Sequence, residues 1–427
     1  MKSFVSRLCG KINPLSIKEY KDNGGFAALE KILFKMSPSE VVDIVKSSKL
    51  KGRGGASFPT GLKWELVASE KANEKYVICN ADEGEPGTFK DKVLIEGCPL
   101  QLLEGMIIAA YAVEASKGYI YIRGEYPKSC DLLRKAVSLL KNEGYLGSGI
   151  LGHSFSFDVE IRSGAGAYVC GEETALIESI EGNQGRSRFK PPYPPVSGLW
   201  QKPTLVNNVE TLFNIPLILS DGAEEFKKLG TESSKGTKLI SACGSIVNKG
   251  VYEVEFGTSL NEIVFDICGG MENNKKLKFV QLGGSSGPCL PESLLDTKLD
   301  FDELKQIGYG LGSGAVLVAD DSICILDFIK NILEFFKHES CGKCTPCREG
   351  VRHIITIVDR ITKGQGSTRD LELIYSISSL MSKASLCGLG QAAPTVITST
   401  LKYFNEEYIE HINGYCRAGV CFKKEVQ

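Results

Sequence analysis

Three cysteines lie within seven residues in the run Cys341-Gly-Lys-Cys344-Thr-Pro-Cys347. A C-x2-C-x2-C run is typical of iron–sulfur cubes, which need thiolates at several corners of one compact object. Pro346 predicts that a helix begins there, and the free amides of a helix N-terminus stabilise negatively charged ligands. Cys387 follows on a predicted loop between two helices and can return to the first three thiols. We therefore expect one [4Fe–4S] cluster on these four cysteines. Structural zinc is the alternative, but zinc sites use paired ligands more often than a three-thiol run.

The remaining cysteines fit a chain that stays in a reducing compartment. The sequence has 15 cysteines and 4 histidines, and its first residues lead into no long apolar segment. It therefore shows no secretory signal, and without a run of 18 apolar residues we expect no membrane insertion. We predict a cytoplasmic protein whose clustered thiols hold metal rather than form disulfides. Six cysteines stand singly in apolar segments and are interpreted as small buried side chains: Cys79, Cys98, Cys130, Cys170, Cys243 and Cys268.

The charge balance argues against two classes of partner. The chain has 50 basic and 52 acidic residues, a formal net charge of -2. Without a basic excess, neither nucleic acid nor an anionic membrane surface is an expected partner.

Hydrophobic periodicity divides the chain into regions of different secondary structure. Up to about residue 220 strands alternate with helices, which predicts an α/β sheet domain. We expect its strands at 76–80, 119–123 and 155–161 and its helices at 37–47, 100–116 and from 127 to near 144. Residues 236 to about 315 are interpreted as a small α+β unit with one helix at 259–268. Four helices with short connections then predict a bundle, at 325–338, 346–363, 369–383 and 391–412. The predicted domains are 1–235, 236–320 and 321–412, followed by a metal-binding tail at 413–427.

A glycine-rich loop precedes the first predicted strand, and two acidic runs follow predicted strands. Residues 51–63 are rich in glycine, which lets backbone amides approach a ligand, and they add the flat face of Phe58 and the charge of Lys63. Residues 80–87 carry three carboxylates after a strand, and the pair at 172–173 begins a helix after a glycine. Ligands of open α/β sheets bind at such strand ends, and carboxylates accept hydrogen bonds from ribose hydroxyls. Each loop alone also fits a solvated turn, but together they indicate a nucleotide-type site.

These segments resemble one family in order and spacing. The chain is similar to the flavin-bearing, NADH-oxidising subunit of respiratory complex I and to the matching subunits of NAD-linked or electron-bifurcating hydrogenases and formate dehydrogenases. The resemblance extends from about residue 20 to residue 415 and is carried by 52–63, 80–87, 171–176, 188–194, 207–211 and the cysteine run.

The resemblance implies a set of cofactor contacts. Positions that match FMN contacts are Gly52, Arg53, Gly54, Lys63, Asn80, Asp82, Glu83, Gly171, Glu172, Asn207, Asn208 and Thr211. Positions that match NADH contacts are Gly55, Phe58, Glu85, Glu173, Lys190 and Tyr193. Ser57 departs from the family, whose members usually have glycine there, and its side chain is expected to tighten the loop.

The resemblance also implies an architecture and a reaction. It predicts an atypical Rossmann-like domain for FMN and NADH, then a ubiquitin-like β-grasp domain, then a four-helix bundle with the [4Fe–4S] cluster. NADH would exchange a hydride with FMN, which would exchange single electrons with the cluster, so no general acid or nucleophile is expected. Three functions stay open: a subunit of a soluble NAD-dependent or bifurcating hydrogenase or formate dehydrogenase, the equivalent subunit of complex I, and a flavin-free scaffold subunit. Expected partners are a thioredoxin-like [2Fe–2S] subunit and a larger iron–sulfur catalytic subunit, with ferredoxin left open.

The C-terminal end carries a second group of metal-ligand residues. His411, Cys416 and Cys421 follow one another in an H-x4-C-x4-C pattern, and Cys324 precedes the first helix of the predicted bundle. If the first and last helices lie side by side, these residues make a Cys3His set suited to tetrahedral zinc. Free tail thiols and a second iron–sulfur cluster are the alternatives. Because such a tail is more typical of hydrogenase-type relatives than of complex I, it favours the first function.

Overall fold

The computed structural model describes residues 3–422 of the chain, and its first region is a parallel four-stranded sheet. The strands are β1 Tyr76–Ala81, β2 Lys117–Ile122, β3 Asp158–Ser163 and β4 Thr204–Asn208, in the order β3-β2-β1-β4. The chain moves outward from β1 to β3 and then returns to the other side of β1. The switch of direction therefore lies between β1 and β4, where open α/β sheets bind their ligands.

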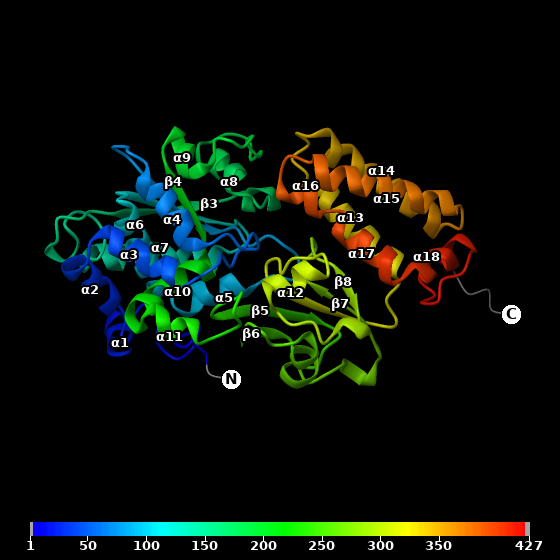
Figure 1. Ribbon diagram of the computed structural model, residues 1–427, viewed down its shortest axis with the longest axis horizontal. Helices are drawn as coiled ribbons and strands as arrows, with labels where there is room; N and C mark the ends of the chain where they lie inside the picture. The colour runs from blue at the N-terminus through cyan, green and yellow to red at the C-terminus, as the bar shows by residue number, and fades with distance from the viewer. Residues whose placement is uncertain (1–2, 423–427) are drawn as a thin grey trace.

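Helices surround this sheet, as the alternating pattern predicted (Figure 1). They are α1 Ile17–Asp22, α2 Ala27–Lys35, α3 Pro38–Ser47, α4 Thr60–Ser69, α5 Lys90–Gly97, α6 Pro99–Val113, α7 Pro127–Asn142, α8 Glu173–Ile180, α9 Pro194–Ser197, α10 Val209–Asp221 and α11 Ala223–Lys227. The predicted helix at 37–47 is confirmed and begins with a capping box between Ser37 and Glu40. β3 begins three residues later than predicted, and β4 was not predicted.

The sheet has an apolar environment on both faces. Val77, Cys79 and Ala81 alternate along β1 with Ile78, because successive strand residues point to opposite faces. The first three belong to the core that includes α6, all of whose side chains are buried. Ile78 belongs to a second core, which continues through α8 into the C-terminal helices. The C-terminal helices therefore share a core with the sheet, and this fixes their position beside it.

The second region contains a mixed five-stranded sheet. Its order is β6-β5-β9-β7-β8, with β5 and β9 parallel and the other neighbours antiparallel. The strands are β5 Thr237–Gly244, β6 Gly250–Glu255, β7 Leu277–Leu282, β8 Cys289–Pro291 and β9 Ala315–Asp320. The helix predicted at 259–268 is a π-helical segment at Glu262–Ile267, and β8 and helix α12 Phe301–Gln306 were not predicted. A β-grasp topology remains an expectation.

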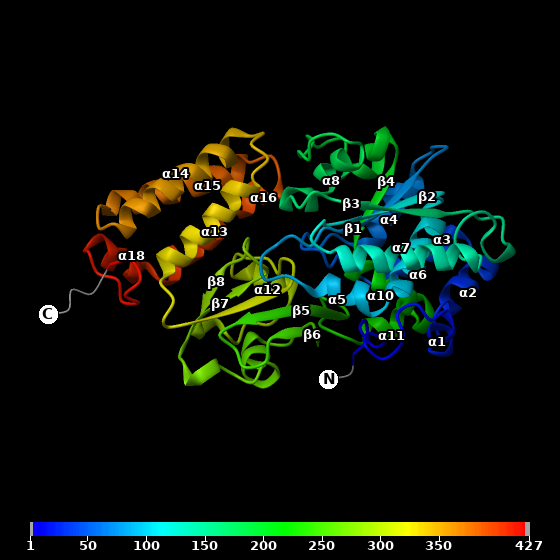
Figure 2. The same ribbon diagram turned by 180° about the vertical axis from the view of Figure 1, so that it is seen from behind.

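The third region is helical and lies beside the second sheet (Figures 1 and 2). Its helices are α13 Ile325–Glu339, α14 Thr345–Thr362, α15 Thr368–Ala384, α16 Gly388–Ala392, α17 Thr395–Tyr403 and α18 Asn405–Ile412. The single helix predicted at 391–412 is wrong, because this segment breaks after Ala392 and again after Tyr403. The first break lies at Pro394, which has no amide hydrogen to continue a helix. Residues 423–427 of the predicted tail lie outside the described part of the chain.

Length and apolar character decide whether any helix of residues 3–422 can span a membrane. No single helix there is long and apolar enough to cross a membrane. Helices α5 and α6 reach that length only as a pair, and they are bent by 96° at their junction.

Candidate functional site

A cavity of about 510 Å³ opens at the switch point of the parallel sheet. Asn80 at the end of β1 and Asn208 at the end of β4 line it from the sheet. Gly54 approaches so closely that a Cβ atom there would lie 2.9 Å from Cβ of Asn208. The glycine-rich loop thus lies directly against the strand ends.

Half of the predicted cofactor residues line this cavity. They are the FMN candidates Gly54, Asn80, Asp82, Glu83, Gly171, Glu172 and Asn208 and the NADH candidates Gly55 and Glu85. Ser57, in the same glycine-rich loop, has φ +56°, a left-handed conformation that favours glycine. This conformation gives a physical reason for the glycine expected at that position.

Other FMN candidates support the cavity from behind. The Arg53 guanidinium donates to the carbonyl of Lys235, 2.7 Å away, and lies over the Phe256 ring at 4.6 Å. Its backbone amide donates to Thr211 Oγ1 at 2.9 Å, while Asn207 accepts from the Trp64 indole. These side chains hold the loop and strands in place. Gly52 likewise does not line the cavity.

Two remaining NADH candidates, Glu173 and Lys190, form a charged group beside the cavity with the FMN candidates Lys63 and Glu172. Lys63 Nζ lies 2.8 Å from Glu173 Oε2, and Lys190 Nζ bridges Glu172 at 2.8 Å and Glu173 at 3.0 Å. Burial opposes ionisation of Glu173, but the two ammonium groups outweigh it and lower its pKa to about 2. The aromatic candidates, Phe58 and Tyr193, are exposed by 44% and 55%. Open aromatic faces of this kind can stack on a base.

One carboxylate in the cavity lacks a hydrogen-bond partner. Asp82 Oδ2 is buried and accepts no hydrogen bond within residues 3–422, and burial raises the pKa of Asp82 to about 7. Such an oxygen is costly unless a ligand donates to it. The hydroxyl and ring N–H groups of a flavin nucleotide are suitable donors, so the residues present fit the expected cofactor.

Several residues that line the cavity were missed from the sequence. Lys90 lies between Asp91 at 2.6 Å and Glu210 at 2.9 Å, and Lys238 lies 2.5 Å from the same Glu210. Lys90 and Asp91 line the cavity, whereas Glu210 and Lys238 do not. All four are almost fully buried, so a network of paired charges supports this side of the cavity. The aromatic wall residue Tyr168 was also missed. Further lining residues come from the loops at 286–288 and 308–313, which lie in glycine-rich segments, and from helix α16 and the first residue of α17. That glycine content was the signal available in the sequence.

The four cysteines predicted to bind a cluster surround a second, smaller cavity. Cys341, Cys344 and Cys347 approach it from the start of α14, and Cys387 lies directly before α16. Gly390 packs so tightly that a Cβ atom there would lie 2.8 Å from Cβ of Cys347. The four thiols are thus brought together from two helix starts.

The two cavities are neighbours. Val169, from the turn before α8, and Leu389, from α16, each line both of them. Only single side chains therefore separate the site at the sheet edge from the site of the four thiols.

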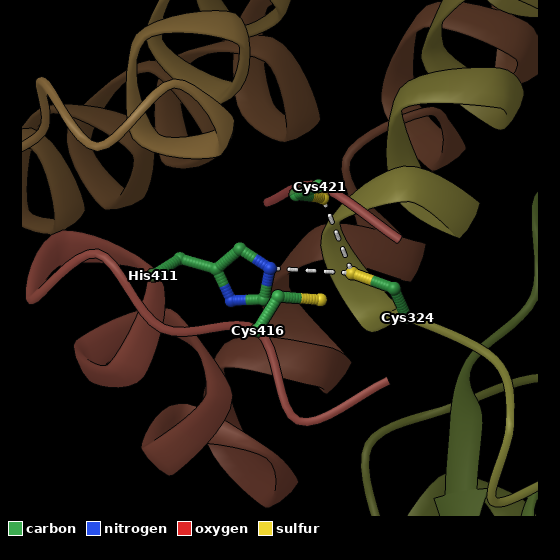
Figure 3. A group of neighbouring side chains, drawn as sticks. All are labelled: Cys324, His411, Cys416 and Cys421. Atoms are coloured by element: carbon green, nitrogen blue, oxygen red, sulfur yellow. Dashed lines mark hydrogen bonds between the residues drawn. The ribbon is translucent and has the colours of Figure 1, made fainter. Parts of the chain in front are cut away.

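The third predicted group is also brought together (Figure 3). One ligand atom from each of Cys324, His411, Cys416 and Cys421 lies within 4.8 Å of the others. Cys324 Sγ is 3.3 Å from His411 Nε2 and 3.6 Å from Cys421 Sγ. His411 Nδ1 lies 2.6 Å from the carbonyl of Glu407, which orients the ring so that Nε2 faces the sulfurs. This is a Cys3His donor set with the spacing of a closed tetrahedral site.

An organic cofactor site beside a set of four thiols defines an oxidoreductase component that contains both a flavin and an iron–sulfur cluster. Sequence comparison agrees: the Nuo51 FMN-binding domain matches residues 45–217, and the NADH-ubiquinone oxidoreductase-F iron-sulfur binding region matches residues 327–411. The chain belongs to the family of NADH-binding FMN and iron–sulfur subunits of complex I and NAD-linked hydrogenases. Its cofactors are accordingly FMN, NAD(H) and one [4Fe–4S] cluster.

Both hydrogenase subunits and NADH-quinone oxidoreductase subunits are similar to this chain over most of its length. The chain is 48% identical to the NADP-reducing hydrogenase subunit HndC of Solidesulfovibrio fructosivorans, covering 98% of this chain and 85% of that protein. It is 46% identical to an NADH-quinone oxidoreductase subunit of Rhizobium meliloti, over 93% of this chain and 94% of that protein. A crystal structure of an NAD+-reducing [NiFe]-hydrogenase superposes with a TM-score of 0.82 at 35% identity, covering 94% of this chain and 67% of that one.

Proposed function

We propose that this protein is the NAD(H)-reacting subunit of a multi-subunit hydrogenase or formate dehydrogenase, with complex I as the alternative assembly. The observation that carries the proposal is the shared wall of the two cavities, formed by Val169 and Leu389. It brings a nucleotide-sized site next to four thiols, the arrangement needed to pass electrons between a flavin and a cluster.

We propose that FMN lies against the strand ends and the first glycine-rich loop. Asn80, Asp82 and Asn208 would bind its polar groups, and Glu83 and Glu172 would complete that side of the cavity. Bound FMN would supply the exchange between a two-electron hydride and single electrons. Arg53, Asn207 and Thr211 would act by holding the loop and strand.

We propose that NADH enters over the acidic loop and the charged group beside the cavity. Glu85 and Glu173 would accept hydrogen bonds from coenzyme hydroxyl or amide groups, and Phe58 and Tyr193 would stack on its rings. The proposal includes a preference for NADH over NADPH, because carboxylates near a ribose repel a 2′-phosphate. A relative that is named for NADP reduction makes this preference worth a direct test.

We assign the four thiols of the smaller cavity, from Cys341 to Cys387, to the [4Fe–4S] cluster. The Cys3His group at Cys324 is proposed to hold structural zinc, which would join the tail to the start of α13. That site favours the hydrogenase-type assembly, since the tail is typical of those relatives. The assembly would then supply a thioredoxin-like [2Fe–2S] subunit and a larger catalytic subunit, with ferredoxin as a further redox partner to be tested.

Two measurements on the native protein test this proposal. The protein with its copurifying subunits should be yellow, contain one FMN per chain and reduce a dye with NADH. A preparation without flavin and without NADH-dependent dye reduction would instead support a scaffold role. Identification of the copurifying subunits then separates the assemblies, because a quinone-linked membrane arm would indicate complex I and a hydrogen- or formate-converting subunit would indicate the proposed assembly.

A further inference from the structure

The glycine-rich loops of the second sheet contribute to the proposed coenzyme site. The segment at 283–288 follows β7, and the segment at 308–314 precedes β9. They pack on each other through glycine, since a Cβ atom on Gly312 would lie 2.4 Å from the carbonyl oxygen of Gly283. They also meet the first loop, because a Cβ atom on Gly55 would lie 3.6 Å from the carbonyl carbon of Gly312. The second sheet therefore supplies part of the cavity wall.

Glu85 is the point at which the acidic loop is attached to this wall. Its Oε1 accepts hydrogen bonds from the Ser286 hydroxyl at 2.6 Å and from the Ser286 amide at 3.0 Å. Gly284 makes that approach possible, because a Cβ atom there would lie 2.3 Å from the carboxyl carbon of Glu85. A second contact joins the same elements, between the hydroxyls of Thr88 and Ser313 at 2.7 Å. Both hydrogen bonds from Ser286 use Oε1, so Oε2 is the oxygen that Ser286 does not engage.

We propose that Ser286 is a positioning residue for the coenzyme: it fixes the Glu85 carboxylate so that the second sheet helps determine how tightly NAD(H) binds. This inference rests on the proposed function of Glu85 in binding NADH. A carboxylate held in one rotamer loses little conformational freedom when a coenzyme hydroxyl or amide donates to it. Without the serine hydroxyl, that ordering must take place at each binding event.

The hydroxyl also favours the ionised form of Glu85. Burial raises the pKa of Glu85, and hydrogen bonds from Ser286, Ser313 and Tyr168 oppose that effect. Tyr168 is the titratable side chain among these donors, and Asp82 and Glu83 line the same cavity. Loss of the Ser286 hydroxyl should therefore raise the pKa of Glu85 further and protonate it at higher pH.

The test compares Ser286→Ala with Ser286→Thr in the FMN-loaded protein. We expect Ser286→Ala to raise the NAD+ dissociation constant measured by calorimetry, and the KM for NADH, by about tenfold, with kcat within about twofold. The acid limb of kcat/KM should move to higher pH, and Ser286→Thr should restore both values. The control is Ser259→Ala, which removes an exposed serine–glutamate hydrogen bond of 2.8 Å, to Glu262, elsewhere in the same region. It should leave the dissociation constant and the pH profile unchanged.

The outcomes separate this inference from the proposed function. If Glu85→Gln raises the dissociation constant but Ser286→Ala does not, the positioning role is wrong and the role of Glu85 stands. If Glu85→Gln has no effect, the proposed function of Glu85 itself is wrong. In the double variant Glu85→Gln/Ser286→Ala, the second substitution should raise the dissociation constant little beyond the first, because both act through one carboxylate. Full additivity would overturn the inference.

Discussion

Lys343, inside the cysteine run, donates from Nζ to the backbone carbonyl of Ser187 at a distance of 2.7 Å. The same ammonium lies 5.0 Å from the centre of the Phe189 ring. Ser187 also lines the cavity of the four thiols, and the next residues lead to Lys190, which pairs with Glu173. The loop of the expected cluster is thus attached to the segment expected to contact NADH.

Replacement of Lys343 by methionine should change the cluster potential. A cation near a cluster stabilises its more negative reduced state, so its removal should lower the midpoint potential. We expect a decrease of about 30 mV, which corresponds to roughly 0.7 kcal/mol for one electron. A redox titration followed by EPR measures it. Lys363→Met at the other end of α14 is the matched control, about 27 Å away by the helix rise. An equal decrease in both variants would contradict a local effect.

Replacement of Cys387 by serine should disturb the cluster and spare the flavin. Cys387 is the one expected ligand from outside the 341–347 run, so the substitution leaves that run intact. We expect an altered or lost EPR signal of the reduced cluster and less iron per chain, with the FMN content unchanged. An unchanged signal and iron content would show that the fourth ligand lies elsewhere.

Replacement of Glu173 by glutamine should weaken discrimination against NADPH. The substitution removes a carboxylate expected to repel a 2′-phosphate, and it also frees the ammonium groups of Lys63 and Lys190 to attract one. We expect wild type to prefer NADH strongly. In the variant, the ratio of kcat/KM for NADH to kcat/KM for NADPH should fall by about tenfold or more. Equal use of both coenzymes by wild type would contradict this placement of Glu173.

Replacement of Asp82 by asparagine should change how stability depends on pH in the cofactor-free protein. Burial raises the pKa of Asp82 from 3.8 to about 7, so in this range the folded state retains a proton that the unfolded chain has released. The stability of wild type therefore falls as pH rises through this window, and Asp82→Asn removes that loss. Between pH 4 and pH 8 the free energy of unfolding of the variant should gain about 4 kcal/mol relative to wild type. Urea titrations of both proteins at both pH values measure this. The same change in the free energy of unfolding between pH 4 and pH 8 in wild type and Asp82→Asn would contradict it.

The residues that could be predicted are those whose pattern is local. Ser37 with Glu40 marks a helix start, and the thiols from Cys341 to Cys347 mark their own site through spacing alone. Cys324 was connected with His411 because two helices were expected to lie side by side, and the structure brings them together. In each case a few neighbouring residues, or one simple packing assumption, carried the prediction.

The residues that could not be predicted depend on contacts distant in sequence. Ser286 reaches Glu85 across 201 positions, and Lys238 reaches Glu210 from a strand in the other sheet. The glycines around Ser286 mark a special loop but do not identify Glu85 as its partner, and nothing around Lys238 distinguishes it from an ordinary strand residue. Arg53 shows the converse, because its motif predicts a cofactor contact whereas its buried side chain binds the carbonyl of Lys235.

The Cys3His group should bind about one zinc per chain. The separations of His411 Nε2 and Cys421 Sγ from Cys324 Sγ, 3.3 Å and 3.6 Å, approach the roughly 3.5–3.8 Å between ligands that share a tetrahedral zinc ion. The buried thiols also gain from a metal, because burial raises the pKa of Cys324 and a bound cation would favour its thiolate. Elemental analysis of wild type and Cys416→Ser measures the zinc content.

We expect Cys416→Ser to lose most of its zinc while the FMN content and the EPR signal of the [4Fe–4S] cluster stay unchanged, because the two metal sites use different thiols. Cys268→Ser is the matched control, since Cys268 is equally buried but belongs to the core of the second sheet. It should retain zinc. Less than about half an equivalent in wild type, or no loss in Cys416→Ser, would reject the site. Iron in excess of one cube, lost in Cys416→Ser, would instead show that these four residues hold a second iron–sulfur cluster.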